Sequence, residues 1–290
     1  MTEFEHAQEA MAQGNLEDAI SGYTRALELD NLSLRNRTRA HNARGNAHLL
    51  LNDFDQALID FNRVIELNPK SPFSYQSRSL AYFKSGRYNE AITDFTRTIQ
   101  LDPEYVYAYI YRSDAYFRLG LFDHAISDYE KLMELNPEDL YIYFNRGLAY
   151  FYNDKFKKAE NDFEQCLELD SQDAQAMIWL YLSRERGGRT GELQLVAQSK
   201  NMKPRHWPHQ IAFMLLDNLT PELLLEDTLD ADPNVEKERL GEAYFFIGQY
   251  HIVRGQDFKA KENLQKCVTT SDHGIIRSAA LMELERFKRE

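Results

Sequence analysis

The stretch Arg78–Pro103, RSLAYFKSGRYNEAITDFTRTIQLDP, recurs with small changes along the chain. Thirty-four residues later, Arg112–Pro137 reads RSDAYFRLGLFDHAISDYEKLMELNP, and the same pattern is found in Arg44–Pro69 and Arg146–Asp170. A period of this length, made of two helical halves and a tight turn, predicts a series of stacked helix hairpins. Because each hairpin contacts mainly its neighbours, the 290 residues do not have to divide into two globular domains.

Each predicted hairpin carries three anchors at fixed spacing. The turn residue is of a type that tolerates a left-handed backbone: Gly14, Asn52, Gly86, Gly120, Asp154 and Gly255. Five residues later comes an alanine: Ala19, Ala57, Ala91, Ala125, Ala159 and Ala260. Four further on comes a large apolar residue: Tyr23, Phe61, Phe95, Tyr129, Phe163 and Leu264. A small residue followed one turn later by a large one lets two helices approach closely and interlock.

The spacing of these anchors divides the chain into three parts. Residues 1–173 hold five hairpins, of which the first is short. The interval from Ala19 to Ala57 is four residues longer than the period, which predicts a longer first helix or entry loop in the second hairpin. Residues 174–240 form a divergent helical segment, and residues 241–290 a degenerate hairpin with a C-terminal capping helix.

Arginine and aspartate recur together, 16 residues apart, in four hairpins. The pairs are Arg44 and Asp60, Arg78 and Asp94, Arg112 and Asp128, and Arg146 and Asp162. The first hairpin has His6 and Gly22 at these places and so lacks both partners. We expect a bidentate ion pair between the two helices of each hairpin. The alternative is a row of guanidinium groups that binds an acidic ligand.

Composition excludes several classes of protein. The net charge of −12 argues against a nucleic-acid partner, which needs excess lysine and arginine. Cys166 and Cys267 lie inside helical apolar patterns, where buried thiols are expected rather than a disulfide or metal framework. No segment is apolar over the length of a membrane span, and the N-terminus carries no export signal. We therefore expect a cytoplasmic protein, or a periplasmic or envelope protein if a leader has been removed.

The repeats identify a family. Residues 1–173 and 241–274 resemble tetratricopeptide repeats (TPRs) through RGNAH, NDF and the related motifs above. The resemblance implies an all-α, right-handed superhelical solenoid with a concave groove lined by first helices. Residues 174–288 resemble the C-terminal half of NlpI-type bacterial TPR lipoproteins, through WLYLS, W-P-HQIAFMLLDNLTPELLL and EAYFFIGQYHIVRGQDFKAKENL. That likeness implies a homodimeric envelope adaptor for proteases and peptidoglycan hydrolases, although this chain lacks a lipoprotein signal.

Stepping three and four residues along the first helices identifies the face that would line the groove. It carries aromatic side chains with interleaved polar groups, as a peptide-binding groove requires. The candidate residues are Arg39, Asn42, Asn46, Phe73, Gln76, Phe83, Lys84, Tyr107, Ile110, Asp114, Phe117, Arg118, Tyr141, Phe144 and Phe151. Packing of these rings between neighbouring helices is the alternative for about half of them.

Other candidate sites are weaker. Arg35, Arg37 and Arg39 form a basic run that either pairs with Glu28 and Asp30 or binds an acidic partner. The carboxylate clamp of chaperone-binding TPR proteins uses paired cations and asparagines in successive first helices. Asn42 and Asn46 fit two of its places, but the other places hold Gln76, Ser77, Tyr107 and Tyr111, so a chaperone tail is not the expected ligand.

The sequence shows no catalytic constellation. The run RGGRTG lacks the spacing of a phosphate-binding loop, and His206 and His209 have no further metal ligands nearby in the sequence. We therefore predict a non-catalytic scaffold without a cofactor or metal that binds a protein or peptide partner. An NlpI-like adaptor and a regulatory subunit of an enzyme encoded elsewhere are the alternatives.

Overall fold

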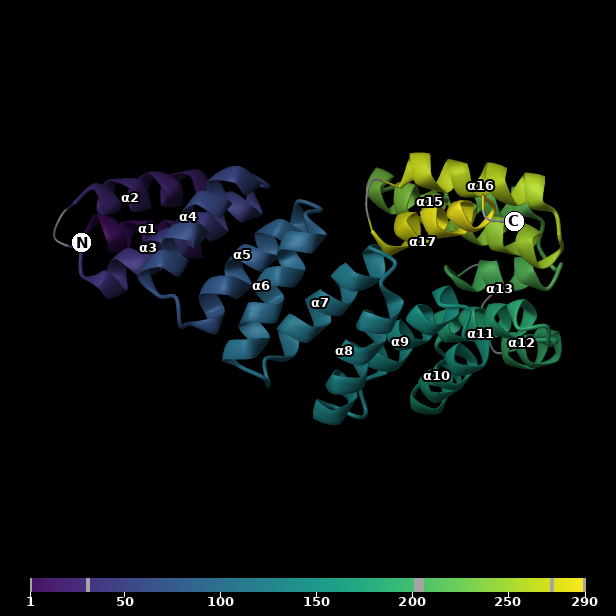
Figure 1. The fold of residues 1–290 in the computed structure, drawn as a ribbon. Coiled ribbons are helices and arrows are strands. Elements are labelled where there is room, and N and C mark those ends of the chain that lie inside the picture. Colours follow the sequence, from purple (N-terminus) through teal and green to yellow (C-terminus); the bar gives the residue numbers. More distant parts are fainter. Residues whose placement is uncertain (1, 30–31, 201–205, 272–273, 289–290) are drawn as a thin grey trace. The chain divides into compact units, whose positions relative to one another are not determined.

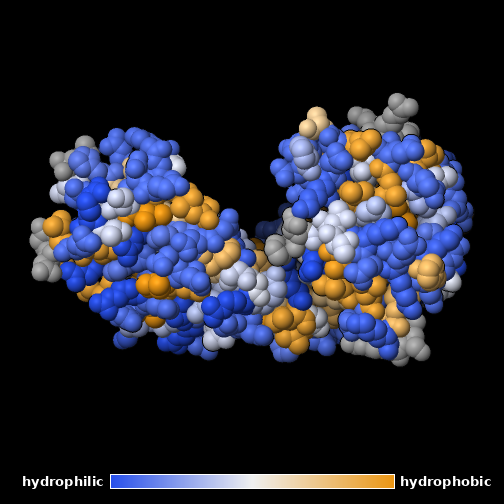
Figure 2. Space-filling view, turned by 90° about the horizontal axis from the view of Figure 1, so that it is seen from above, coloured by the Kyte–Doolittle hydropathy of each residue, from blue (hydrophilic) through white to orange (hydrophobic). Residues whose placement is uncertain are grey.

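The structure is a computed structural model that describes residues 2–29, 32–200, 206–271 and 274–288. Within these ranges every regular element is a helix, and the helices follow one another as antiparallel hairpins (Figure 1). The chain divides into two compact units, residues 1–119 with 130–135 and residues 120–129 with 136–290. Polar side chains cover most of the face seen in Figure 2, and apolar ones form separate patches on it.

The first unit is built from three hairpins and the helix that follows them. Its helices are α1 (Glu3–Ala12), α2 (Leu16–Glu28), α3 (Leu34–Leu50), α4 (Phe54–Leu67), α5 (Pro72–Lys84), α6 (Tyr88–Leu101) and α7 (Val106–Arg118). The next helix, α8 (Phe122–Leu135), contributes residues to both units. The long interval between the first two anchors lengthens α3 to 17 residues, against 13 in α5. The extra turn is therefore helical, as one of the two predictions had it.

The second unit contains two regular hairpin helices, a divergent segment and a terminal hairpin with its cap. Its helices are α9 (Leu140–Tyr152), α10 (Phe156–Leu169), α11 (Ala174–Arg186), α12 (Glu192–Ser199), α13 (His209–Leu215), α14 (Pro221–Glu226), α15 (Pro233–Val253), α16 (Asp257–Thr270) and α17 (Ile275–Arg286). Thr220 caps α14, its hydroxyl accepting a hydrogen bond from the Leu223 amide.

The three anchors lie where the repeat places them. All six turn residues have positive φ, including Asn52 at 60° and Asp154 at 54°. The six alanines are fully buried, and the six large residues are at most 2% exposed. The interlocking also needs a small residue on the first helix: a Cβ added at Gly45 would lie 2.8 Å from the Phe61 ring. Helix spacing is therefore set by residues of both helices.

The divergent segment loses the repeat pattern because its first helix is buried on all sides. Ala174 and the eight consecutive residues 176–183 of α11 are buried. No polar face therefore remains to give the sequence a helical period. Trp179 is the centre of this core, with its ring 5.1 Å from that of Phe151 and 5.7 Å from that of Phe246. The last hairpin also departs from the repeat, because the ring of Phe258 near the start of α16 is 82% exposed.

Helix α17 closes the second unit through an inward-facing charge network. Glu283 is 1% exposed and forms ion pairs with both Arg186 and Arg286. Arg286 also donates to the Tyr152 carbonyl at 2.9 Å and to Asp154 at 2.7 Å. A buried carboxylate needs such partners to offset its desolvation.

Candidate peptide-binding surface

The Arg–Asp pairs lock the hairpins, and the structure confirms three of them as bidentate contacts. Arg78 donates from Nε and Nη2 to the two carboxylate oxygens of Asp94 at 2.7 and 2.8 Å. The pairs Arg44–Asp60 and Arg146–Asp162 have the same geometry. The fourth pair, Arg112 with Asp128, stays a prediction.

These arginines also contact the preceding repeat, through hydrogen bonds that the separation of 16 residues does not predict. The remaining guanidinium nitrogen reaches the second helix of the preceding hairpin, so that one side chain joins two repeats. Arg44 donates to Thr24, Arg78 to Asn62 and Arg112 to Thr96. These three partners recur near the repeat period and could have been found by that signal. With both edges engaged, Arg44 and Arg78 serve the stack rather than an incoming ligand.

The ion pairs shift the pKa values of two of their members. Burial raises the pKa of Asp60, but hydrogen bonds from Arg44 and His41 outweigh it and place the pKa below its ordinary value. The hydrogen bond to Asp94 raises the pKa of Arg78. Asp60 and Arg78 are therefore held in their charged forms.

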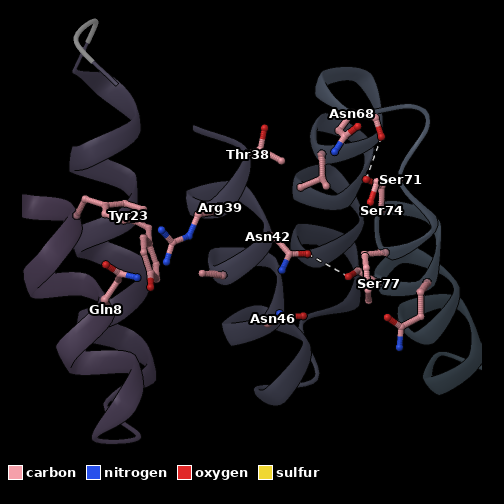
Figure 3. A pocket seen from close by; sticks show the side chains of 15 residues that line it. Gln8, Tyr23, Thr38, Arg39, Asn42, Asn46, Asn68, Ser71, Ser74 and Ser77 are labelled. Carbon is pink, nitrogen blue, oxygen red and sulfur yellow. Dashed lines mark hydrogen bonds between the residues drawn. The ribbon is translucent and has the colours of Figure 1, made fainter. Parts of the chain in front are cut away.

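An open pocket of about 520 Å³ lies in the first unit, where α1 and α2 meet α3 and α5 (Figure 3). This volume is within the range of small-molecule and peptide-anchor sites. The lining side chains come from the five helices α1 to α5 and from the loop before α5. They are Phe4, Gln8, Tyr23, Thr38, Arg39, Asn42, Ala43, Asn46, Val64, Asn68, Ser71, Phe73, Ser74, Gln76 and Ser77.

Five predicted groove residues line this pocket. Arg39, Asn42 and Asn46 come from α3, and Phe73 and Gln76 come from α5. Arg39 points toward Tyr23 and Gln8, whereas Asn42 points toward Ser77 of α5 (Figure 3). The pocket therefore brings together residues of two successive first helices, as the resemblance implies.

Glu28 does not pair with the basic run, and the other predicted partner, Asp30, lies outside the described residues. Arg35, Arg37 and Arg39 have no ion pair in the described residues, a range that excludes Asp30. The Arg39 guanidinium instead lies over the Phe4 ring, 5.7 Å from its centre.

The first aromatic ladder is exposed. Phe73 and Tyr107, both 62% exposed, occupy the same place in α5 and α7, and Tyr141 at that place in α9 is 42% exposed. Phe73 packs edge-on against Tyr105, whose hydroxyl donates to Gln76 Oε1 at 2.9 Å. A rigid base thus holds the exposed ring of Phe73.

The second aromatic ladder belongs mainly to the core, which corrects its assignment to an open groove. Phe117 is 3% exposed and Phe151 is fully buried, while Phe83 is half-buried between Tyr88 and Tyr111. Phe151 is covered because the rings of Phe156 and Trp179 pack against it. Sequence spacing alone could not separate the two ladders, since both follow the same period.

The remaining candidates divide in the same way. Arg118 pairs with Asp114 at 3.1 Å and lies over the Phe83 ring, so neither charge is a free binding group. Burial raises the pKa of Asp114 despite this partner. Phe144 packs edge-on against Phe163. Lys84 is exposed and Ile110 is half-buried, so these two remain on the accessible face.

No group of three or more histidine, cysteine or acidic side chains in the described residues could hold a metal ion. Cys166 and Cys267 are buried free thiols, as predicted, and burial raises their pKa to about 12 and about 11. No helix of the described chain combines the length and the apolar character needed to cross a membrane.

Family models account for the repeats. Models of the tetratricopeptide repeat match residues 4–72 and 140–173, and a TPR repeat model matches residues 79–120 and 113–154. The chain is a tetratricopeptide repeat protein. No curated protein matches this TPR protein in sequence. The NlpI-type resemblance of its C-terminal half stays a prediction.

Solved structures share the fold at low identity. A tetratricopeptide repeat protein from Parabacteroides merdae is 14% identical with a TM-score of 0.65, over 98% of this chain and 97% of that one. The C-terminal part of a TPR repeat-containing protein from Cytophaga hutchinsonii is 18% identical with a TM-score of 0.59, over 96% and 99%. YrrB, described as a TPR protein with an unusual peptide-binding site, is 19% identical with a TM-score of 0.53, over 60% and 88%. At these identities the likeness shows the fold alone.

Proposed function

We propose that this protein is a non-catalytic scaffold that binds an extended peptide segment of a partner along α3, α5 and α7. The observation that carries the proposal is the exposure of Phe73 and Tyr107, both 62%, at one register of successive first helices beside an open pocket. Exposed aromatic rings on a rigid base are the usual anchors of protein interfaces. The family models that match describe repeats, and none of them describes an enzyme.

The surface has the chemistry of a peptide site. Asn42, Asn46 and Gln76 offer amide groups that can pair with a peptide backbone, while Phe73 and Tyr107 offer apolar contact area. That the solved relative YrrB is described by its peptide-binding site supports the same use of the fold.

A peptide-display selection on the purified protein tests the proposal. We expect selected peptides to lose at least about tenfold in affinity when Phe73 and Tyr107 are both changed to alanine, because truncating two anchors removes more than about 1.4 kcal/mol. Phe258→Ala is the matched control, since that ring is 82% exposed but lies in the second unit. Selected peptides that bind Phe73→Ala/Tyr107→Ala as well as they bind the unaltered protein would refute the proposal.

The identity of the partner is a separate matter. An NlpI-like envelope adaptor and a regulatory subunit both remain predictions, and each would use this surface for a different partner. The homodimer that the resemblance implies is tested by light scattering at several protein concentrations.

A further inference from the structure

The first turn of α10 is basic, whereas α2, α4, α6, α8 and α16 each carry an acidic residue there. Helix α10 starts with Phe156, Lys157 and Lys158, Lys155 precedes it, and its first turn has no acidic residue. The acidic residues at this place in the other second helices are Glu17, Asp18, Asp55, Glu90, Asp123 and Asp257. Cations at the N-terminus of a helix oppose its dipole and lower its stability. Helix formation alone therefore does not account for these three lysines.

An open pocket of about 650 Å³ lies at this helix start. Helix α11 packs beside α10 (Figure 1), which brings the loop after α11 to the first turn of α10. The lining residues all belong to the second unit, and none of them lies on a first helix: Asp154, Lys155, Phe156, Lys157, Lys158, Gly187 and Arg189. Asp154 is already paired with Arg286 at 2.7 Å. Four cations thus line one pocket of a chain whose net charge is −12.

A buried carboxylate fixes two of these cations at the edge of the pocket. Arg189, from the loop RGGRTG at residues 186–191, pairs with Glu160 of α10. Glu160 is 3% exposed and also pairs with Lys157 at 3.2 Å and with Arg184 at 3.1 Å. Arg184 is shared with a second glutamate. Three cations therefore face two carboxylates, which leaves one positive charge in excess at this edge.

The other two lysines are available to a ligand. Lys155 pairs with Asp123 at 2.7 Å, but their side chains are 41% and 76% exposed, and solvent weakens such a pair. The Lys158 ammonium lies 5.2 Å from the centre of the Tyr150 ring and forms no ion pair within the described part of the chain. Phe156 is half-buried and gives the pocket an apolar wall. The site thus combines mobile and fixed cations with one aromatic ring.

We propose that this pocket binds a phosphate monoester, with Lys157, Lys158 and Arg189 around the phosphoryl group and the apolar part of the ester against Phe156. A phosphate monoester carries about two negative charges at neutral pH and three acceptor oxygens, so it matches several cations at once. A sulfate ester carries a single charge and matches them less well. This inference goes beyond the proposed function and is independent of it, because the residues along α3, α5 and α7 take no part.

Phenyl phosphate and phenyl sulfate test the proposal, because they have nearly the same shape and differ in charge. Lysine-selective isotope labelling of the full chain gives the backbone amide NMR signals of Lys157 and Lys158, which Lys157→Gln and Lys158→Gln assign. We expect phenyl phosphate to shift both signals and to bind about fivefold more tightly than phenyl sulfate, as one further charge at an exposed site allows. Equal binding of the two probes overturns the inference.

Variants separate the pocket from general electrostatics. Lys157→Gln/Lys158→Gln should weaken the binding of phenyl phosphate about tenfold, because two cations are removed. Lys266→Gln is the matched control and should leave binding unchanged, since Lys266 is also a half-exposed lysine beside a tyrosine ring on a second helix of the same unit. The melting temperature of Lys158→Gln should be unchanged or higher, because the variant removes a cation from a helix start. Unchanged binding in the double variant, or an equal loss in Lys266→Gln, overturns the inference.

Further probes distinguish the sources of the phosphate group. Acetyl-phosphotyrosine-amide represents a phosphorylated residue of a partner, and adenosine monophosphate represents a free nucleotide. The tighter of the two assigns the pocket to its source. Inorganic phosphate that binds as tightly as phenyl phosphate would overturn the inference, because the apolar part of the ester would then contribute nothing.

Discussion

Removing Arg78 tests the idea that the recurring Arg–Asp pairs hold the array together. In the variant Arg78→Met, Asp94 loses two hydrogen bonds of 2.7 and 2.8 Å, and Asn62 loses a third. Asp94 is only 3% exposed, so its carboxylate stays buried without a counter-charge. Breaking a buried pair costs about 3–5 kcal/mol, and the partial exposure of Arg78 lowers our expectation to about 2–3 kcal/mol.

A double-mutant cycle separates the pair from the loss of each side chain. The cycle combines Arg78→Met with Asp94→Ala, and urea unfolding followed by circular dichroism gives the free energy of unfolding. We expect a coupling energy of about 2 kcal/mol, because a hydrogen bond to a charged group contributes about 1.5–3 kcal/mol to stability. Hydrogen exchange then locates the loss of protection in α5 and α6, which matters because repeat arrays can unfold in parts.

An exposed ion pair supplies the control for this cycle. Arg63 and Glu66 form a pair whose side chains are 51% and 61% exposed. Arg63→Met should cost less than about 0.5 kcal/mol, since solvent screens such pairs. A coupling energy below about 0.5 kcal/mol for Arg78 and Asp94 would refute the reasoning and return the arginines to the set of candidate ligand-binding groups.

Three further outcomes follow from the geometry. Gly45→Ala should lower the melting temperature, although alanine favours helices, because its Cβ would lie 2.8 Å from the Phe61 ring. Adding Phe61→Leu to this variant should recover part of the loss. An unchanged melting temperature in Gly45→Ala would contradict the close packing. The pKa of Asp60 is lower in the folded protein than in the unfolded chain, so the unfolded chain binds more protons in acid. The stability that Asp60 contributes is therefore present above the ordinary pKa of about 3.9 and is lost as the pH falls through the folded pKa. Asp60→Asn should therefore flatten the acid limb of a stability–pH curve, and an identical limb would exclude this role. Cys166, with a pKa of about 12, should resist iodoacetamide at pH 8 until the chain is unfolded, as followed by mass spectrometry; rapid labelling of the folded protein would show that the thiol is accessible.

The sequence by itself determined the repeat, its anchor residues and most of the Arg–Asp pairs within the hairpins. A 34-residue period fixes which residues meet within a hairpin, because the turn at Gly86 and the contact of Ala91 and Phe95 are local. The same locality made the Arg78–Asp94 pair predictable from a constant separation of 16 residues. Such features depend on one repeat and its immediate neighbour, so pattern alone is enough to place them.

The tertiary structure decided which of the periodic residues are accessible. Phe73 and Phe83 lie on the same predicted face and recur with the same period, yet Phe73 is exposed while the ring of Phe83 is held between Tyr88 and Tyr111. Burial depends on side chains contributed by neighbouring helices, which a one-dimensional period does not describe. The pocket around Arg39 was hidden for the same reason, since its walls come from five helices that meet only in the folded chain.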